Sequence, residues 1–550
     1  MTEISALQKA RSTYSAKLPP ALAKGAGVKF TEGEATACVA DADRIAALFE
    51  ATFGSPQITF EAKKGGEYQA LTVGVILSGG QAPGGHNVIA GIYDGLKSLN
   101  PDSKLYGFLK GPDGLIKGEQ MLLTDKIIDA YRNTGGFDMI GSGRTKLETE
   151  EHFLAAAANC KKLGITALVI IGGDDSNTNA CLLAEYYKKN NTGINVIGCP
   201  KTIDGDLKNE CIETSFGFDT ACRVYSELIG NIGRDANSAK KYWHFIKLMG
   251  RSASHIALEC ALQVQPNITI ISEEVAARKM TLRDIVDYMA DIVVARANRG
   301  DNFGVALIPE GLIEFVPEMK KLISALNDLL AHEAETFNAL FDTDDKIQFI
   351  SSRLEQESSY VFSSLPRAIQ IQLCLDRDPH GNVQVSLIET EKMLAEMIGL
   401  RLAELKSAGV YTGKFAAQSH FFGYEGRCAA PSNYDADYCY SLGYTAAALL
   451  GINVTGYMAS VRNTTKPASE WIAGGIPITM MMNMERRHGA DKPVIQKALV
   501  ELGGKPFRTF VEKRAEWALN TSYLYPGPIQ YFGPAEVCDQ PTKTLMLERG

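Results

Sequence analysis

The sequence predicts an α/β fold built on mainly parallel sheets, and three observations lead to this prediction. Short apolar runs rich in β-branched residues recur along the chain, with helical segments between them. Such continuous apolar runs are typical of strands buried on both faces of a parallel sheet. Polar, glycine-rich loops directly follow several runs, as in α/β proteins that bind ligands at the carboxyl ends of their strands. At 550 residues the chain exceeds an ordinary single core, so we expect at least two domains.

The expected strands lie in the middle of the chain, after an N-terminal extension of about 70 residues with helical segments. We expect a further short strand that ends at Ile140. The other expected strands are residues 71–77, 104–110, 167–171, 194–198, 243–249, 268–271 and 303–308.

Residues from about 317 to 405 break this alternation and are expected to form a helical insertion. Apolar residues recur there at helical spacing, and a DPHGN turn at residues 378–382 interrupts them. We interpret these stripes as packing surfaces rather than as sites of chemistry. Their residues are Met319, Leu322, Ile323, Leu326, Leu329, Leu330, Leu394, Ile398, Leu402 and Leu405.

Composition and charge exclude several classes of function. The formal net charge is −8, which argues against nucleic acid or an anionic membrane as the main partner. No run of about 18 apolar residues is present to span a bilayer, and the first residues lack the pattern of a secretory signal. The 11 cysteines show neither zinc-site spacing nor a disulfide framework, which fits a reducing compartment. We therefore expect a cytoplasmic protein.

Two loops with glycines lie after expected strands and could contact an anion. Residues 78–87 read SGGQAPGGHN, and paired glycines allow backbone amides to approach an anion at the start of a helix. Residues 141–146 read GSGRTK, in which Arg144 could present its planar guanidinium to phosphate oxygens. Taken singly, a structural turn or a solvated arginine explains each loop about as well. Neither loop contains a Walker A or GxGxxG motif.

A third loop, residues 172–180, reads GGDDSNTNA and carries two adjacent carboxylates. Asp174 and Asp175 follow a glycine pair at the carboxyl end of an expected strand, where ligands bind in α/β sheets. Carboxylates at this place suit Mg²⁺, which often uses one or two of them together with substrate phosphates. A helix cap explains one aspartate equally well, but two in succession exceed what a cap requires.

A fourth loop, residues 200–207, reads PKTIDGDL and combines a lysine with two aspartates. Asp204 could accept the proton of a sugar hydroxyl during phosphoryl transfer, and Lys201 could neutralise phosphate charge. A turn formed by Asp204, Gly205 and Asp206 is the structural alternative.

The order and spacing of the four loops resemble the phosphofructokinase family. Three further motifs support the resemblance: MGR at residues 249–251, PEG at 309–311 and YEGR at 424–427. The combined pattern covers about residues 70 to 460 and is most similar to the long, pyrophosphate-dependent branch. It implies two layered α/β domains with a helical insertion. It also implies reversible, Mg²⁺-dependent transfer of phosphate from pyrophosphate to the 1-hydroxyl of fructose 6-phosphate, in glycolysis or gluconeogenesis.

The resemblance further implies a division of the chain. Residues 71–215 would bind the phosphate donor and Mg²⁺, and part of residues 425–550 would return to complete this domain. Residues 216–424 would bind fructose 6-phosphate and contain the helical insertion. Residues 1–70 would be an extension outside both.

The resemblance assigns roles residue by residue. Asp204 would be the base that takes the proton of the 1-hydroxyl, and Arg144 would stabilise the transferring phosphoryl group. The implied catalytic residues are Asp204, Arg144, Asp175 and Lys201. The implied pyrophosphate-binding residues are Gly79, Gly80 and Lys201. Asp174 is the implied ligand of Mg²⁺.

The sugar phosphate is expected to bind through several other segments. Lys241 and Tyr242 match positions that reach the site of a neighbouring subunit, which implies a homodimer or a higher homo-oligomer. Tyr424 and Arg427 match positions that hold the 6-phosphate. The full implied set is Thr202, Ile203, Asp204, Lys241, Tyr242, Met249, Gly250, Arg251, Glu310, Tyr424, Glu425, Gly426 and Arg427.

Departures from the ATP-using relatives favour pyrophosphate as the donor. Those relatives carry a glycine where this chain has Asp175, whose bulk and charge would oppose the α-phosphate of ATP. Lys201 supplies a compensating cation. Tyr242 and Gln418 stand where ATP-using enzymes place arginines, so which groups neutralise the 6-phosphate is left open. The alternatives are an ATP-dependent phosphofructokinase, a catalytically silent regulatory subunit and, with least support, a dinucleotide-dependent dehydrogenase.

Overall fold

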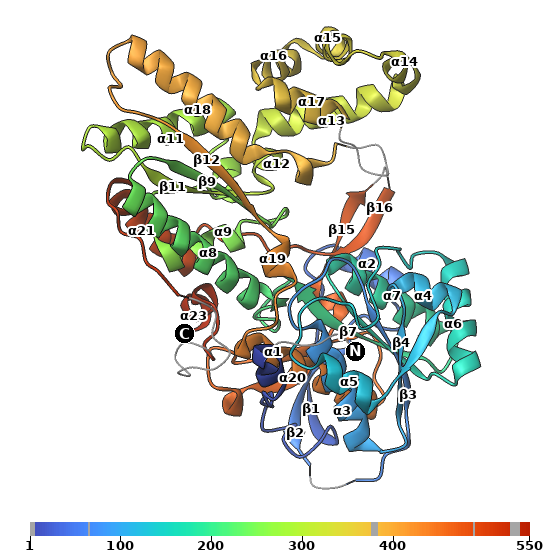
Figure 1. Cartoon of the computed structure of the whole chain (residues 1–550). Helices are drawn as coiled ribbons and strands as arrows, with labels where there is room; N and C mark the ends of the chain where they lie inside the picture. The colour runs from blue at the N-terminus through green and yellow to red at the C-terminus, as the bar shows by residue number, and fades with distance from the viewer. Residues whose placement is uncertain (1–5, 64–65, 376–382, 488–489, 528–538) are drawn as a thin grey trace. The chain divides into compact units, whose positions relative to one another are not determined.

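The protein folds into two units, each of which combines separate stretches of the chain. The computed structural model describes residues 6–63, 66–375, 383–487, 490–527 and 539–550 (Figure 1). Unit 1 comprises Met1–Val224, Tyr424–Ala498 and Ile529–Gly550, and unit 2 comprises Tyr225–Gly423 and Leu499–Pro528. Within the described residues, no helix is long and apolar enough to cross a membrane.

Unit 1 is built on a ten-stranded sheet whose central strands are parallel. In the central strand β3, the side chains of Val75 and Leu77 point to one face of the sheet and that of Ile76 points to the other, and all three are fully buried. Both faces of the sheet are therefore covered, as continuous apolar runs predict. The central strands, in spatial order, are β13 (Tyr457–Arg462), β7 (Asn195–Thr202), β6 (Ala167–Gly172), β3 (Thr72–Leu77) and β4 (Lys104–Phe108).

The prediction for the first 70 residues was incomplete. They contain α1 (Ala6–Ser12) and α2 (Ala42–Leu48), but also β1 (Val28–Ala35) and β2 (Pro56–Ala62), which extend the sheet. All residues of β1 except Val28 are exposed, because it is an edge strand and lacks an apolar run. The remaining strands of this sheet are β5 (Gln120–Leu123), β8 (Phe216–Gly217) and β14 (Ile472–Pro477).

Helices and a short hairpin complete unit 1. One hydrophobic cluster joins the side chains of Ile76 and Ile170 to those of α6 and α7. The helices α3 and α20 pack closely on each other, because a Cβ at Gly91 would overlap the backbone of Tyr440. The helices are α3 (Gly85–Leu99), α4 (Pro112–Lys117), α5 (Asp125–Tyr131), α6 (Glu150–Leu163), α7 (Asp174–Lys189), α19 (Tyr424–Arg427), α20 (Asn433–Gly451) and α23 (Lys543–Arg549), and the hairpin pairs β15 (Met482–Arg487) with β16 (Ala490–Ile495).

The prediction of a strand that ends at Ile140 is wrong. The chain turns at this place, and the carbonyl of Ile140 accepts a hydrogen bond from the amide of Lys110 at 2.9 Å. The only strand-like pairing nearby is an isolated bridge between Ser78 and Gly143 among the described residues. The buried apolar residues before Gly141 therefore fill the core from a turn rather than from a strand.

Unit 2 contains a four-stranded sheet in which every pairing is parallel. Its strands, in spatial order, are β10 (Ile268–Thr269), β11 (Gly304–Pro309), β9 (Trp243–Leu248) and β12 (Ala417–Phe422). The sequence did not predict β12, because this edge strand is mostly exposed and mixes polar and apolar residues. Helices around this sheet are α8 (Phe218–Ala239), which begins in unit 1, α9 (His255–Val264), α10 (Ser272–Ala277), α11 (Leu282–Ala297), α12 (Leu312–Phe315) and α21 (Lys505–Leu519).

The predicted helical insertion is confirmed within unit 2. Its apolar stripes are packing surfaces, since Leu322, Leu326, Leu394 and Ile398 are fully buried in one cluster. The turn expected at residues 378–382 lies outside the described residues. The helices are α13 (Pro317–His332), α14 (Ala334–Ala339), α15 (Thr343–Arg353), α16 (Gln356–Ser364), α17 (Arg367–Leu375) and α18 (Thr390–Ser407).

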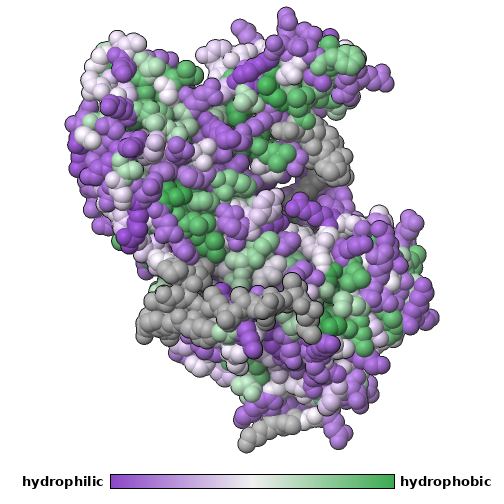
Figure 2. All heavy atoms as spheres, in the orientation of Figure 1, coloured by the Kyte–Doolittle hydropathy of each residue, from purple (hydrophilic) through white to green (hydrophobic). Residues whose placement is uncertain are grey.

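The surface is predominantly hydrophilic on the face that Figure 2 shows, with smaller hydrophobic patches between polar side chains. Exposed hydrophobic side chains of unit 2 include Phe341, Tyr360 and Leu400. Single apolar side chains of this kind are common on protein surfaces.

Candidate active site

Three of the four polar loops lie side by side at one edge of the unit 1 sheet. The strands β3, β6 and β7 are parallel neighbours, so their carboxyl ends meet at the same edge. The amide of Ser78 donates to the carbonyl of Ile171 at 2.8 Å, and the hydroxyl of Ser176 donates to that of Ser78 at 2.8 Å. The fourth loop joins them, because the amide of Gly79 donates to the carbonyl of Gly143 at 2.8 Å.

The glycine-rich loop after β3 lies against two cationic side chains. Gly79 has a φ of +82°, and a Cβ there would lie 3.3 Å from the ammonium of Lys201. A Cβ at Gly80 would overlap the guanidinium of Arg427, whose Nε donates to the carbonyl of Gln81 at 3.1 Å. The absence of side chains at the two glycines thus leaves room for two positive charges beside partly exposed backbone. This arrangement suits an anion.

The acidic loop after β6 begins helix α7. Asp174 and Asp175 occupy its first turn, where the helix dipole favours negative charge. Asp174 is partly buried and Asp175 is exposed. The side-chain amide nitrogen (Nδ2) of Asn177 donates to the carbonyl of Gly172 at 2.7 Å and to that of Cys199 at 3.4 Å, and it thereby links β6 to β7. Sequence reasoning missed this role of Asn177, since the residue looked like part of the helix.

The loop after β7 holds the proposed base in a compact turn. The amide of Asp204 donates to the hydroxyl of Thr202 at 3.0 Å, and Gly205 adopts a φ of +73°. Lys201 and Asp206 are buried, whereas Asp204 is only partly so. The Asp204 side chain is therefore more accessible than those of Lys201 and Asp206.

Burial and mutual repulsion shift two pKa values at this edge. Burial, together with the charge of Arg427, lowers the pKa of Lys201 to about 8, although the carboxylates of Asp204 and Asp174 oppose this effect. Burial, together with the nearby carboxylate of Asp204, also raises the pKa of Asp206 to about 7. Perturbed titratable groups of this kind are typical of functional sites.

Sequence reasoning missed one cation of this edge, Lys497. Its ammonium lies 3.6 Å from Oδ2 of Asp174 and 3.9 Å from Oδ2 of Asp206. Burial acts to lower the pKa of Lys497, but the carboxylates of Asp174 and Asp206 outweigh this effect and raise it. No local motif marks Lys497, because it reaches the site from a segment some three hundred residues later in the chain.

Arg144 lies in the loop that joins the glycine-rich turn. Its side chain is exposed and makes no hydrogen bond or ion pair with any residue that the structure describes. The loop itself is fixed, since the hydroxyl of Thr145 donates to Asp113 at 2.6 Å and that of Ser142 to the carbonyl of Gly79 at 2.5 Å. The guanidinium of Arg144 is therefore accessible to a ligand from a well-held backbone.

Unit 2 carries the sugar-site residues predicted after β9 and β11. The Glu310 carboxylate accepts a hydrogen bond from the amide of Gly250 at 3.0 Å, and the amide of Glu310 donates to the carbonyl of Leu248 at 2.9 Å. The exposed side chain of Arg251 forms a bidentate ion pair with Glu314, with distances of 2.9 and 2.8 Å. Met249, Gly250, Arg251 and Glu310 thus lie on two neighbouring strand ends of one sheet.

The remaining predicted sugar-binding residues have other surroundings. Tyr424 and Glu425 of α19 are exposed, and the guanidinium carbon of Arg427 lies 5.8 Å from the centre of the Tyr424 ring. Because Arg427 also contacts the glycine-rich loop of unit 1, its predicted role at the 6-phosphate stays a prediction. In unit 2 Lys241 is exposed, and the ring of Tyr242 meets that of His244 edge-on at 6.4 Å.

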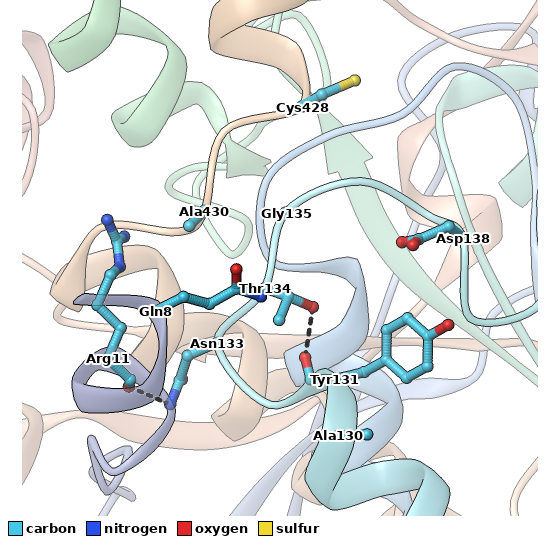
Figure 3. A pocket seen from close by; sticks show the side chains of 10 residues that line it. All are labelled: Gln8, Arg11, Ala130, Tyr131, Asn133, Thr134, Gly135, Asp138, Cys428 and Ala430. Atoms are coloured by element: carbon cyan, nitrogen blue, oxygen red, sulfur yellow. Dashed lines mark hydrogen bonds between the residues drawn. The ribbon is translucent and has the colours of Figure 1, made fainter. Parts of the chain in front are cut away.

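A pocket of about 420 Å³ lies elsewhere in unit 1 (Figure 3). Side chains of α1, of α5 and of two loops line it, and the side-chain amide of Asn133 donates to the carbonyl of Arg11 at 3.2 Å. None of the residues predicted for the active site lines this pocket. Its lining residues are Gln8, Arg11, Ala130, Tyr131, Asn133, Thr134, Gly135, Asp138, Cys428 and Ala430.

Comparisons with known proteins agree with this geometry. Residues 72–363 match the family model described as phosphofructokinase. The chain is 61% identical over 548 residues to the pyrophosphate–fructose 6-phosphate 1-phosphotransferase of Porphyromonas gingivalis, covering 99% of each chain. It is 56% identical over 557 residues to the protein of that name from Treponema pallidum (strain Nichols), covering 99% of this chain and 97% of the relative.

A solved structure supports the fold. The crystal structure of a pyrophosphate-dependent phosphofructokinase from Nitrosospira multiformis superposes with a TM-score of 0.54 and 15% identity, covering 84% of this chain and 96% of the other. At this identity the likeness concerns the fold, which is the predicted layered α/β architecture with mainly parallel sheets. Together with the family match and the full-length relatives, it leads to one conclusion. The chain belongs to the phosphofructokinase family.

Proposed function

We propose that the protein transfers a phosphoryl group reversibly from pyrophosphate to the 1-hydroxyl of fructose 6-phosphate. The observation that carries this proposal is the edge of the unit 1 sheet, where a glycine-rich loop and a buried lysine adjoin a cluster of aspartates. The full-length relatives named pyrophosphate–fructose 6-phosphate 1-phosphotransferase support it. The reaction belongs to glycolysis or gluconeogenesis, according to its direction.

Asp175 and Lys201 make pyrophosphate the preferred donor. Asp175 is exposed in the first turn of α7, where its carboxylate would repel the additional phosphate of a nucleotide. Lys201 places a buried ammonium beside Gly79, at the loop that would contact the donor. A short, highly charged donor is thereby accommodated, and a longer one is opposed.

Asp204 is the proposed general base. Its carboxyl would accept the proton of the 1-hydroxyl while the hydroxyl oxygen attacks the nearer phosphorus of the donor. The compact turn formed with Thr202 holds this carboxyl in place. The guanidinium of Arg144 and the ammonium of Lys201 would balance charge on the transferring group, and phosphate would leave with the bonding electrons.

The residues at this edge fit a Mg²⁺ ion that arrives with the donor. Asp174 offers a partly exposed carboxylate at the start of α7, with further carboxylates close by. No group of three or more candidate ligand side chains is assembled among the described residues, which excludes a complete protein cage there. One or two carboxylates with substrate phosphates and water are the usual ligands of Mg²⁺. When bound, the ion would neutralise charge on the phosphoryl oxygens.

The acceptor and the assembly complete the proposal. Met249, Gly250, Arg251 and Glu310 of unit 2 would bind fructose 6-phosphate, and Lys241 would serve the site of a neighbouring subunit in a homodimer or higher homo-oligomer. A cytoplasmic location accords with the cysteines, which are all free among the described residues. Nucleic acid and membrane are not proposed as partners, in keeping with the net charge of −8.

The test is a comparison of donors with the purified protein and fructose 6-phosphate. We expect turnover with pyrophosphate and Mg²⁺, with kcat/KM exceeding that for ATP by about 100-fold or more, since like-charge contacts cost several kcal/mol. The reverse reaction, from fructose 1,6-bisphosphate and phosphate, should proceed in the same preparation. A preference for ATP would identify an ATP-dependent enzyme, and no turnover with either donor would identify a silent subunit.

A further inference from the structure

We propose that Lys497 balances the charge of the donor site, so that an anionic donor can bind beside a cluster of carboxylates. This inference rests on the proposed function, because it concerns how pyrophosphate is admitted. Lys497 belongs to none of the motifs that carry the family resemblance. It is a positioning residue, acting through Asp174 and Asp206.

The need for such a cation follows from the charges at the sheet edge. The Lys497 ammonium interacts with all four aspartates of the two acidic loops, in the order Asp174, Asp206, Asp204 and Asp175. An anion brought to this edge meets their combined negative potential. Lys201 is a buried cation near them, but it lies against Gly79. Lys497 is therefore placed to offset the carboxylates through its ion pairs with Asp174 and Asp206.

Lys497 forms ion pairs with Asp174 and Asp206 whose distances are longer than those of hydrogen bonds. The 3.6 and 3.9 Å separations from Asp174 and Asp206 exceed the 2.7–3.2 Å range of an N–H···O hydrogen bond. The ammonium thus makes the electrostatic potential at both carboxylates less negative, through its charge rather than through a short hydrogen bond to Asp174 or Asp206. The side chain is about one third exposed, so the interaction is partly screened by solvent.

The backbone around Lys497 is held on both sides. The amide of Ile495 donates to the hydroxyl of Thr178 in α7 at 3.2 Å, and that of Gln496 to the carbonyl of Met481 at 2.8 Å. On the other side, the amide of Ala498 donates to the carbonyl of Asp206 at 2.7 Å. These bonds connect the segment after β16 to α7 and to the loop after β7. Lys497 therefore comes from a fixed backbone, as a positioning role requires.

The experiment compares Lys497→Met with the parent protein by calorimetric titration of pyrophosphate with Mg²⁺, in the absence of fructose 6-phosphate. Loss of the ammonium should weaken pyrophosphate binding by about 10- to 100-fold, the usual cost of losing a charged partner. Steady-state kinetics should show a similar rise in KM for pyrophosphate, a change of less than about threefold in KM for fructose 6-phosphate, and a smaller effect on kcat.

A second titration gives an effect of opposite sign. Removal of a cation next to Asp174 strengthens the local negative potential, so free Mn²⁺, used as a spectroscopic probe, should bind the variant as tightly as the parent or more tightly. Lys497→Arg should restore pyrophosphate binding to within a few-fold, because it keeps the charge.

Lys492→Met is the matched control. Lys492 lies on β16, shortly before Lys497 in the chain, and pairs with Glu148 at 2.8 Å. It should leave pyrophosphate binding unchanged. The proposal is overturned if Lys497→Met binds pyrophosphate as tightly as the parent does, or if it binds both Mn²⁺ and pyrophosphate more weakly. It is also overturned if Lys492→Met weakens pyrophosphate binding as much as Lys497→Met does. Lys497→Gln serves in the same titrations if the methionine variant does not fold. If the parent itself fails to bind pyrophosphate, the proposed function fails first.

Discussion

The two parallel sheets of this protein end in loops of different character. At the edge of the unit 1 sheet, the Lys497 ammonium lies 3.6 Å from the carboxylate of Asp174 and 3.9 Å from that of Asp206. Burial lowers the pKa of Lys201 there to about 8. At the edge of the unit 2 sheet, Arg251 forms a bidentate pair at 2.8 and 2.9 Å, and Glu310 binds the amide of Gly250 at 3.0 Å.

This difference indicates a division of labour. Charges that are largely removed from water interact strongly with an incoming ligand, and burial shifts the pH at which they titrate, which is what chemistry requires. Charges that pair between the segments after β9 and β11, as Arg251 does with Glu314, hold a shape and change little, which suits recognition of a sugar phosphate. We therefore expect substitutions in unit 1 to affect kcat and the KM for pyrophosphate. Substitutions in unit 2 should affect mainly the KM for fructose 6-phosphate.

The largest effect is expected for Asp204→Asn. The amide cannot accept the hydroxyl proton, so kcat should fall by about 10²–10⁴-fold, the usual contribution of a general base. Affinity for fructose 6-phosphate should be largely kept, because the turn with Thr202 depends on the backbone amide of residue 204. Steady-state kinetics and calorimetric binding of fructose 6-phosphate provide the two measurements.

Asp206→Asn is the useful control for that variant. Asp206 is buried in the same turn, and burial together with Asp204 raises its pKa to about 7. A smaller loss of kcat than for Asp204→Asn is expected. If Asp204→Asn keeps nearly normal kcat while Asp206→Asn loses it, the assignment of the base must move to Asp206.

A second prediction concerns pH and Lys201. A lowered pKa means that the charge of Lys201 is present below pH 8 and is lost as pH rises through about 8. In the free enzyme, kcat/KM for pyrophosphate should therefore fall by about tenfold per pH unit above that value, since one essential proton is lost. Lys201→Arg should move this fall to higher pH, because a guanidinium stays charged.

The arginine variant also distinguishes the titration of the enzyme from the titration of its substrate. Pyrophosphate itself titrates in this range, but it does so identically for both proteins. Only the difference between the two pH profiles reports on Lys201. Superimposable profiles would mean that another group controls the alkaline limb.

Much of the fold and part of the site could be predicted from the sequence. Buried parallel strands such as β6 consist of continuous apolar residues, and the loops that follow them carry local motifs. Edge strands such as β1 and β12 gave no such signal, because their residues are mostly exposed. The apolar residues before Gly141 were mistaken for a strand, since burial in a turn and burial in a strand select the same residue types.

The site was predicted where its residues are adjacent in sequence and missed where folding brings them together. Asp174 and Asp204 lie in recognisable loops. The contacts of Asn177 with the carbonyl of Cys199, and of Lys497 with Asp174, depend on tertiary structure. Arg427 shows the same limitation, because its position next to Gly80 could not be derived from the YEGR motif.

The smallest effect is expected in unit 2, for Lys241→Ala. Lys241 is exposed directly before β9, and the resemblance assigns it to the sugar site of a neighbouring subunit. Its loss should raise KM for fructose 6-phosphate by about 3- to 10-fold, in the range of an exposed charge contact, with little change for pyrophosphate. Lys240→Ala, which removes the adjacent lysine, is the control and should change neither constant.

A mixing experiment tests whether the site is shared between subunits. In a dimer of one Lys241→Ala chain and one Asp204→Asn chain, one site carries both substitutions and the other carries neither. Subunit exchange should therefore generate a component with the parent's KM, because the unaltered site combines Asp204 of one chain with Lys241 of the other. Differently tagged chains allow the mixed dimer to be isolated and its stoichiometry verified. If exchange occurs and only the high-KM component remains, Lys241 serves the site of its own chain. In that case, the different effects expected for substitutions in unit 1 and in unit 2 would both concern a site within one subunit.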